Sequence, residues 1–106
     1  VNIINKAKEK KKKVFAVGTT AVRSLESVAT EDKKIQPYSG KTKLYITPGY
    51  GFKVVDAIIT NFHTPLSTNL VLVSSFSTPS VIKKAYLCAK SKKFRFFSFG
   101  DAMLII

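Results

Sequence analysis

The residues best suited to move a proton are one histidine and two aspartates. His63 is the only histidine and lies in a polar stretch, residues 61–65, that ends an apolar segment. An imidazole titrates near neutral pH, so His63 can act as an acid or a base, although a lone histidine is also a common structural residue. Asp56 lies inside the apolar segment and Asp101 near the chain end, where each must be paired, hydrogen-bonded or shifted in pKa. Pairing with Arg23 or with a backbone amide would explain both carboxylates without catalysis.

A glycine turn supplies a candidate anion or ribose site. Gly18 is followed by Thr19 and Thr20, and Arg23 lies one turn into a predicted helix. Backbone amides at a helix start, two hydroxyls and a guanidinium suit a carboxylate, a phosphate or ribose hydroxyls. A capped helix start with a surface arginine explains the same residues. Neither G-x-x-x-x-G-K-[ST] nor G-x-G-x-x-G is present, which disfavours a P-loop or dinucleotide site.

Composition narrows the class of protein. Eighteen Lys and Arg against six Asp and Glu give a net charge of +12, which favours a polyanion such as nucleic acid or an anionic membrane surface. With 45% hydrophobic residues the chain can form one core, and 106 residues exclude a second complete domain. One cysteine, Cys88, excludes an internal disulfide and a cysteine–histidine zinc set. No apolar stretch approaches the roughly 20 residues that cross a bilayer, so we expect a soluble, cytoplasmic protein.

The segments that position these groups follow the order of an α/β fold. Apolar runs predict strands over residues 14–17, 44–47, 54–60 and 94–99. Apolar residues at helical spacing predict helices around residues 3–7, 22–29 and 79–90. The run 14–17 is apolar throughout, which is typical of a strand buried on both faces. Residues 69–76 are too densely apolar to choose between a buried helix and a buried strand, and the polar residues 30–43 predict a surface loop.

Hydroxyl side chains indicate where three helices begin. Thr19 or Thr20 is placed to cap the helix after the glycine turn. Ser67 or Thr68 can cap the densely apolar segment that follows them. Thr78 is followed by a proline, a pattern typical of a cap with proline at the first helical position.

Basic and aromatic residues are interleaved near the end of the chain. The aromatic members are Phe94, Phe96, Phe97 and Phe99, and the basic members are Lys92, Lys93 and Arg95. Such a segment can stack on nucleic-acid bases, and alternation in a half-buried strand explains it without a ligand. The other basic run, Lys10–Lys13, is typical of a solvated helix end.

Four blocks of the sequence resemble one enzyme family in order and spacing. The blocks are Ala16–Glu26, Pro48–Ala57, Thr60–Thr68 and Arg95–Met103. They resemble the C-terminal part of the S-adenosylmethionine:tRNA ribosyltransferase-isomerase family of queuosine biosynthesis. The likeness extends over the whole chain. Compared with the family pattern, Thr64 and Asn69 place polar groups at positions that we expect to be buried.

The resemblance implies a reaction and its partners. The family transfers the ribosyl group of S-adenosylmethionine to 7-aminomethyl-7-deazaguanine at the wobble position of tRNA, isomerises it and releases adenine and methionine, which gives epoxyqueuosine. The sulfonium acidifies the adjacent ribose carbon, so a base must remove that proton and an acid must help adenine leave. The family needs no metal and no membrane, and the full enzyme is expected to be a monomer.

The resemblance also implies residue roles. His63 takes the proton-handling role because it lies in the Asn-Phe-His-x-Pro block, and Asp56 or Asp101 is the alternate. The residues expected to bind substrate, through the methionine carboxylate, the ribose hydroxyls or the walls of the same pocket, are Gly18, Thr19, Thr20, Arg23, Asn61, Ser67 and Thr68. The side chains of Thr19, Arg23, Asn61 and His63 are expected to converge on one hollow.

Family members are much longer than this chain. Their α/β domain is made from both chain ends, and a β-barrel domain is inserted between them. Residues 1–106 are therefore expected to be the C-terminal portion of that α/β domain, without the barrel. Alone, the portion should expose an open sheet edge and an apolar face, and should be inactive. The alternative is a basic RNA-binding remnant without catalysis.

Overall fold

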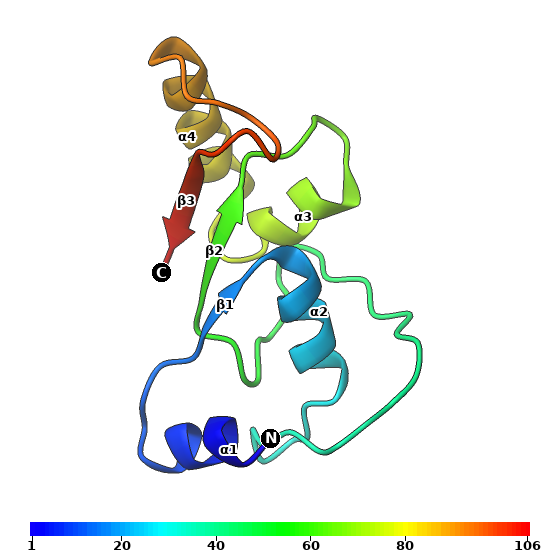
Figure 1. The fold of residues 1–106 in the computed structure, drawn as a ribbon. Helices are drawn as coiled ribbons and strands as arrows, with labels where there is room; N and C mark the ends of the chain where they lie inside the picture. Colours follow the sequence, from blue (N-terminus) through cyan, green and yellow to red (C-terminus); the bar gives the residue numbers. More distant parts are fainter.

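A three-stranded mixed sheet organises the chain (Figure 1). The computed structural model describes residues 1–106. The elements in chain order are α1 (Asn2–Glu9), β1 (Phe15–Val17), α2 (Thr19–Ser27), β2 (Ala57–Asn61), α3 (Thr68–Ser74), α4 (Pro79–Ser91) and β3 (Ala102–Ile105). The strand order is β1-β2-β3, with β1 parallel and β3 antiparallel to β2. The predicted α/β class is confirmed.

The core lies between one face of the sheet and three helices. The sheet contributes the cross-strand row Ala16, Ile58 and Ile105, and α2, α3 and α4 contribute Val22, Leu72, Val73 and Ile82. Helix α1 is confirmed where it was predicted, but it buries none of its residues and lies at the far end of the molecule from α4 (Figure 1). None of the helices is long and apolar enough to reach across a bilayer.

The opposite face of the sheet is open and apolar. Phe15, Val17, Ile59 and Leu104 are 48%, 71%, 36% and 51% exposed. Pairing places Val17 beside Ile59 and Ile59 beside Leu104 on this face. The prediction that residues 14–17 are buried on both faces is therefore wrong, because the helices cover only the side of Ala16. The expectation of an exposed apolar face is confirmed.

Two predicted strands are wrong. Residues 44–47 form no strand, although Ile46 is buried in the core, so their apolar character reflects a loop packed on the helices. Residues 94–99 form turns, and the left-handed φ of 60° at Phe97 prevents a continuous strand. The antiparallel neighbour of β2 is instead β3, a segment that the sequence pattern predicted only as an apolar chain end.

The remaining boundaries follow local chemistry. Strand β2 begins at Ala57, three residues later than predicted. The apolar residues 69–76 contain helix α3, and residues 30–43 hold no helix or ladder strand, as predicted for a loop. Thr78 Oγ1 accepts a hydrogen bond from the Val81 amide at 3.3 Å, which confirms this cap.

The start of α2 differs from the prediction. Its N-cap residue is Gly18, with φ 90° and no side-chain cap, so neither Thr19 nor Thr20 caps the helix. A glycine fits here because this φ is unfavourable for other residues. The prediction for α3 is confirmed, since Ser67 Oγ accepts a hydrogen bond from the Leu70 amide at 3.1 Å.

Candidate functional site

Three chain segments meet at the end of β2 that carries Asn61. The Gly18 amide donates to the Ile59 carbonyl at 2.8 Å, so the glycine turn lies beside the end of β2. The Asn61 Nδ2 donates to the Asp101 carbonyl at 3.3 Å, so the turn before β3 lies there as well. Ligands of α/β sheets gather at the carboxyl ends of parallel strands. This sheet end is therefore the candidate site.

His63 is fixed at this end by two hydrogen bonds. Its Nε2 lies 2.7 Å from Oγ1 of Thr60, a residue that is only 3% exposed. Its backbone amide donates to the Tyr86 hydroxyl at 2.9 Å. Burial lowers the pKa of His63 below the ordinary value of 6.5, so the imidazole is neutral at pH 7. A neutral, oriented imidazole is able to accept a proton.

The His63 ring lines an open cavity of about 470 Å³, which we call the α4 cavity. Its other walls come from α3, α4 and the turns after α4, and include Leu70, Ser74, Ile82, Tyr86 and Phe96. Phe62 packs against Tyr86 and Phe96, with ring centroids 5.3 and 5.0 Å apart. Of the aromatic residues near the chain end, Phe96 thus joins this wall, whereas Phe97 and Phe99 are exposed, and none of them lies in a strand.

The glycine turn is linked through Asn69 to a second, smaller cavity. Thr19 Oγ1 donates to Asn69 Oδ1 at 3.2 Å. Arg23 Nε donates to the Leu44 carbonyl at 3.3 Å, and Arg23, Thr68 and Asn69 line a cavity of about 80 Å³. Asn69 is half-buried with its amide oxygen bonded.

The expectation that Thr19, Arg23, Asn61 and His63 share one hollow is wrong. Helix α3 separates the two cavities: Leu70 and Ser74 line the larger, and Asn69 and Leu72 the smaller. The candidates lie around the same sheet end, but His63 lines the larger cavity, whereas Arg23 and Thr68 line the smaller one. Other residues also differ from the expectation. Asn61 and Thr20 are exposed, and Ser67 caps α3. Thr64, expected to be buried, is exposed.

Asp101 lies at the His63 end of the sheet. Its carboxylate accepts a hydrogen bond from the Arg95 amide and one from Arg95 Nε at 3.4 Å. The hydrogen bond from the Arg95 amide is the main cause that lowers the pKa of Asp101. The hydrogen bond from the Arg95 side chain lowers it as well. The expected pairing with a backbone amide is confirmed, but the cation is Arg95 and not Arg23.

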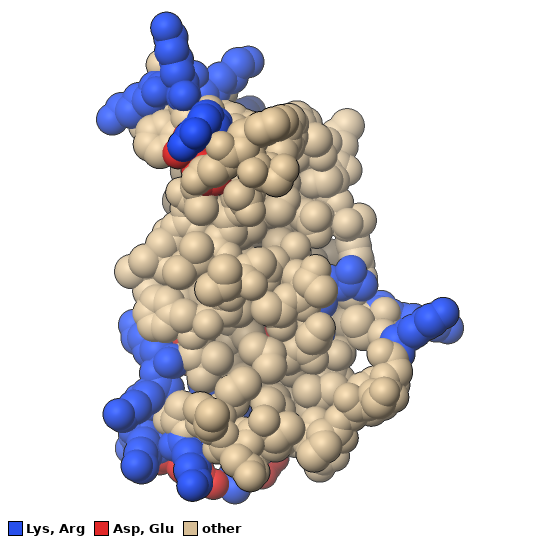
Figure 2. All heavy atoms as spheres, viewed as in Figure 1, with Lys and Arg blue, Asp and Glu red and all other residues tan.

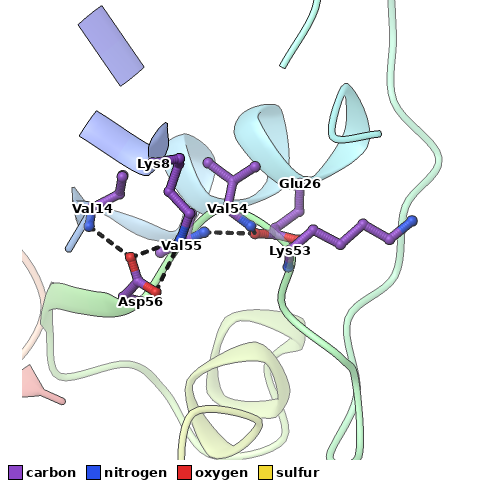
Figure 3. Close-up of polar contacts among 7 residues, drawn as sticks. All are labelled: Lys8, Val14, Glu26, Lys53, Val54, Val55 and Asp56. Carbon is purple, nitrogen blue, oxygen red and sulfur yellow. Dashed lines mark hydrogen bonds and ion pairs between the residues drawn. The ribbon is translucent and has the colours of Figure 1, made fainter. Parts of the chain in front are cut away.

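Asp56 lies at the other end of β2 (Figure 3). Its carboxylate accepts a hydrogen bond from the Val14 amide at 2.7 Å and pairs with Lys8 Nζ at 3.1 Å. Asn61 lies five positions after Asp56, roughly 16 Å along an extended strand. The structure therefore does not bring Asp56 to His63, and its partners give it a structural role in joining α1 to the sheet.

Glu26 was missed as a candidate, although it is a buried carboxylate. It is 4% exposed and accepts hydrogen bonds from the amides of Lys53, Val54 and Val55 at 2.9, 2.9 and 2.8 Å (Figure 3). The Tyr50 hydroxyl adds a fourth at 3.2 Å, and burial, then Glu26, raises the pKa of Tyr50 to about 12. The sequence did indicate that Glu26 is buried, because it follows Val22 by four residues and so lies on the buried face of α2.

Thr60 and Tyr86, which hold His63, were also missed. Both sit inside apolar segments, where a hydroxyl gives no indication of its partner. No group of three or more His, Cys, Asp or Glu side chains lies close enough together to hold a metal ion.

Comparisons with known proteins match the whole chain. Residues 1–105 match the family described as queuosine biosynthesis protein. The S-adenosylmethionine:tRNA ribosyltransferase-isomerase of Halothermothrix orenii is 55% identical over 106 residues, which cover 100% of this chain and 31% of that protein. The enzyme of the same name from Natranaerobius thermophilus is 56% identical over 102 residues, or 96% of this chain and 30% of that protein.

A solved structure also matches this chain over nearly its whole length. The crystal structure of the S-adenosylmethionine tRNA ribosyltransferase of Thermotoga maritima superposes with a TM-score of 0.91 at 46% identity, over 99% of this chain and 37% of that one. The chain therefore spans about a third of the length of these relatives. By sequence and by fold, it belongs to the queuosine biosynthesis protein family.

Proposed function

We propose that these residues are the C-terminal portion of the α/β domain of an S-adenosylmethionine:tRNA ribosyltransferase-isomerase. The match to enzymes of that name over the whole chain carries the proposal. The enzyme would work in the cytoplasm as a monomer on tRNA and S-adenosylmethionine, without a metal. The ribosyl group would be transferred to 7-aminomethyl-7-deazaguanine at the wobble position and isomerised, giving epoxyqueuosine.

His63 is the residue that we assign to proton transfer. Removal of the ribose proton beside the sulfonium needs an unprotonated base, and burial favours the unprotonated form of His63. The hydrogen bond to Thr60 orients the ring at the sheet end. Asp101 remains the alternate because it lies at the same end, whereas Asp56 leaves the proposal because Lys8 and Val14 hold it at the opposite end.

The smaller cavity suits the methionine carboxylate. Arg23 uses Nε for the Leu44 carbonyl, which leaves its terminal amino groups for an anion. Thr68 lines the same cavity, and Thr19 donates a hydrogen bond to Asn69, which also lines it. The first-turn amides of α2, after Gly18, add partial positive charge. These groups together would hold the carboxylate end of S-adenosylmethionine.

The 106 residues alone should be inactive. About two thirds of the length of the relatives lies outside the match, and the open face with Phe15, Val17, Ile59 and Leu104 is apolar. The net charge of +12 favours a second candidate, a basic RNA-binding remnant without catalysis. The two candidates differ in one measurable product, the modified tRNA.

A grafted enzyme tests the proposal. This chain replaces the matching 37% of the Thermotoga maritima protein, and release of adenine from S-adenosylmethionine is measured with tRNA that carries 7-aminomethyl-7-deazaguanine. The graft should form modified tRNA and the 106 residues alone should not. His63→Ala should lower turnover of the graft by about 10²–10⁴.

Thr64→Ala is the matched control, because Thr64 is the exposed neighbour of His63. Its turnover should stay within about twofold of that of the unchanged graft. Near-normal turnover of His63→Ala would remove His63 from the mechanism. A folded graft that binds RNA in a salt-dependent way without product would favour the remnant.

A further inference from the structure

Lysines gather at two opposite ends of a molecule that is 41 Å long (Figure 2). We name the sets by their helices. The α1 cluster is Lys6 and Lys10–Lys13, and the α4 cluster is Lys83, Lys90, Lys92 and Lys93. All of these side chains are exposed. Exposure and charge alone do not separate the two clusters.

Acidic partners separate them. Near the α1 end, Asp56 pairs with Lys8 and Glu9 pairs with Lys34, each at 3.1 Å, and Glu31 pairs with Lys53. Residues 79–101 contain five lysines and one arginine but a single acidic residue, Asp101, which is paired with Arg95 at 3.4 Å. No lysine of either cluster forms an ion pair itself, but the acidic residues Glu9, Glu31 and Asp56 lie near the α1 end, whereas Asp101 is the one acidic residue of the α4 end. The positive field at the α4 end is therefore the less neutralised of the two.

A cavity distinguishes the α4 cluster further. Lys83 and Lys90 line the α4 cavity together with His63, and the interior is formed largely by apolar and aromatic side chains, among them Tyr86 and Phe96. An apolar, aromatic-walled cavity bounded by unpaired lysines suits an unstacked nucleobase with phosphates on either side. The α1 cluster, in contrast, lies beside Lys8, whose ion pair with Asp56 joins helix α1 to the opposite end of β2.

We propose that the α4 cluster and the α4 cavity form the tRNA-binding surface of this portion of the enzyme. A base from a single-stranded loop of the tRNA enters the cavity, and the flanking phosphates bind the lysines. The α1 cluster makes no contact with the tRNA. The inference rests on the proposed function, which supplies tRNA as the partner.

The test measures tRNA affinity of the grafted enzyme at several salt concentrations. The double variant K83E/K90E should weaken binding at least tenfold and reduce the slope of log K against log salt by about 1 to 2. The matched double variant K10E/K12E carries the same change of charge on the α1 cluster and should alter the affinity by less than about threefold. Circular dichroism establishes that each variant is folded.

A second variant tests the cavity separately from the charges. Ser74→Phe fills the α4 cavity without changing the charge, because Ser74 lines its wall. Binding of tRNA should weaken about tenfold while the salt slope stays unchanged, as expected for the loss of one stacked base. If this variant does not fold, Leu87→Phe at the same cavity replaces it.

Three results would overturn the inference. The first is greater weakening by K10E/K12E than by K83E/K90E. The second is unchanged affinity when a folded variant fills the cavity. The third is loss of binding to phosphatidylserine vesicles by K83E/K90E with tRNA binding intact, which would make the surface a membrane contact. The proposed function fails differently, since it fails when the unchanged graft forms no product, whatever its affinity for tRNA.

Discussion

The two ends of β2 use similar residues for different purposes. At the start of the strand, Glu26 and Asp56 are saturated by backbone amides and Lys8, so that their charges hold segments together. At the other end, His63 is held by only one side-chain partner on its ring and opens onto a cavity. A carboxylate whose acceptor sites are filled cannot take part in proton transfer without breaking the structure. The candidate site is therefore distinguished by a side chain whose hydrogen-bonding capacity is not filled, rather than by the type of residue.

The largest expected effect lies at the start of the strand. Glu26→Ala leaves three amides without a partner, two of them in the buried residues Val54 and Val55, and should lower the free energy of unfolding by about 3–5 kcal/mol. Urea denaturation of the chain, followed by circular dichroism, measures this loss. Glu31→Ala is the matched control, since its carboxylate is exposed and forms one surface ion pair, and it should cost about 0.5 kcal/mol or less. Equal losses for the two variants would contradict the structural role of Glu26.

The sequence pointed to more of the polar residues that the fold brings to the second end than of those at the first. Gly18, Arg23, Asn61, His63 and Asp101 could be chosen because turns interrupt the apolar pattern there. These breaks coincide with the carboxyl ends of strands and with helix starts, which local residue types specify.

What the sequence could not predict depends on long-range partners. Thr60 lies within an apolar run, and only the fold places its hydroxyl 2.7 Å from an imidazole. The four bonds of Glu26 join it to residues at least 24 positions away. The strand predicted over 94–99 failed for the same reason, because Phe94 and Phe96 pack on Phe62, and Phe96 also on Tyr86, instead of pairing in a ladder.

A smaller effect is expected when the partner of His63 is removed. Thr60→Val keeps the shape of the side chain but removes the hydroxyl, so the imidazole loses its orientation. In the grafted enzyme kcat should fall about tenfold with the KM for tRNA unchanged, because Thr60 acts through His63 and not on the RNA. Thr60→Ser should restore kcat. A Val variant with normal kcat, or a Ser variant as slow as Val, would contradict the positioning role.

The corresponding change at the first end should be milder still. Asp56→Asn retains an oxygen for the Val14 amide and loses the ion pair with Lys8. Because the carboxylate is a third exposed, the loss of unfolding free energy should be about 0.5 kcal/mol. The kcat of the grafted enzyme should stay within about twofold, which distinguishes Asp56 from His63. A kcat as low as that of His63→Ala would return Asp56 to the site.

The smallest effect is a pH dependence of stability that belongs to His63 alone. Burial lowers the pKa of His63 in the folded chain below the value of 6.5 that it has when unfolded, so at mildly acidic pH the unfolded chain binds the extra proton. The free energy of unfolding should therefore decrease as the pH falls through 6.5, and this contribution should stop changing below the folded pKa. Urea denaturation between pH 5 and pH 8 should show the decrease in the unchanged chain and in Asp56→Asn, but less of it in His63→Gln. Identical pH profiles for the unchanged chain and His63→Gln would mean that the imidazole is as free to take up a proton in the folded chain as in water.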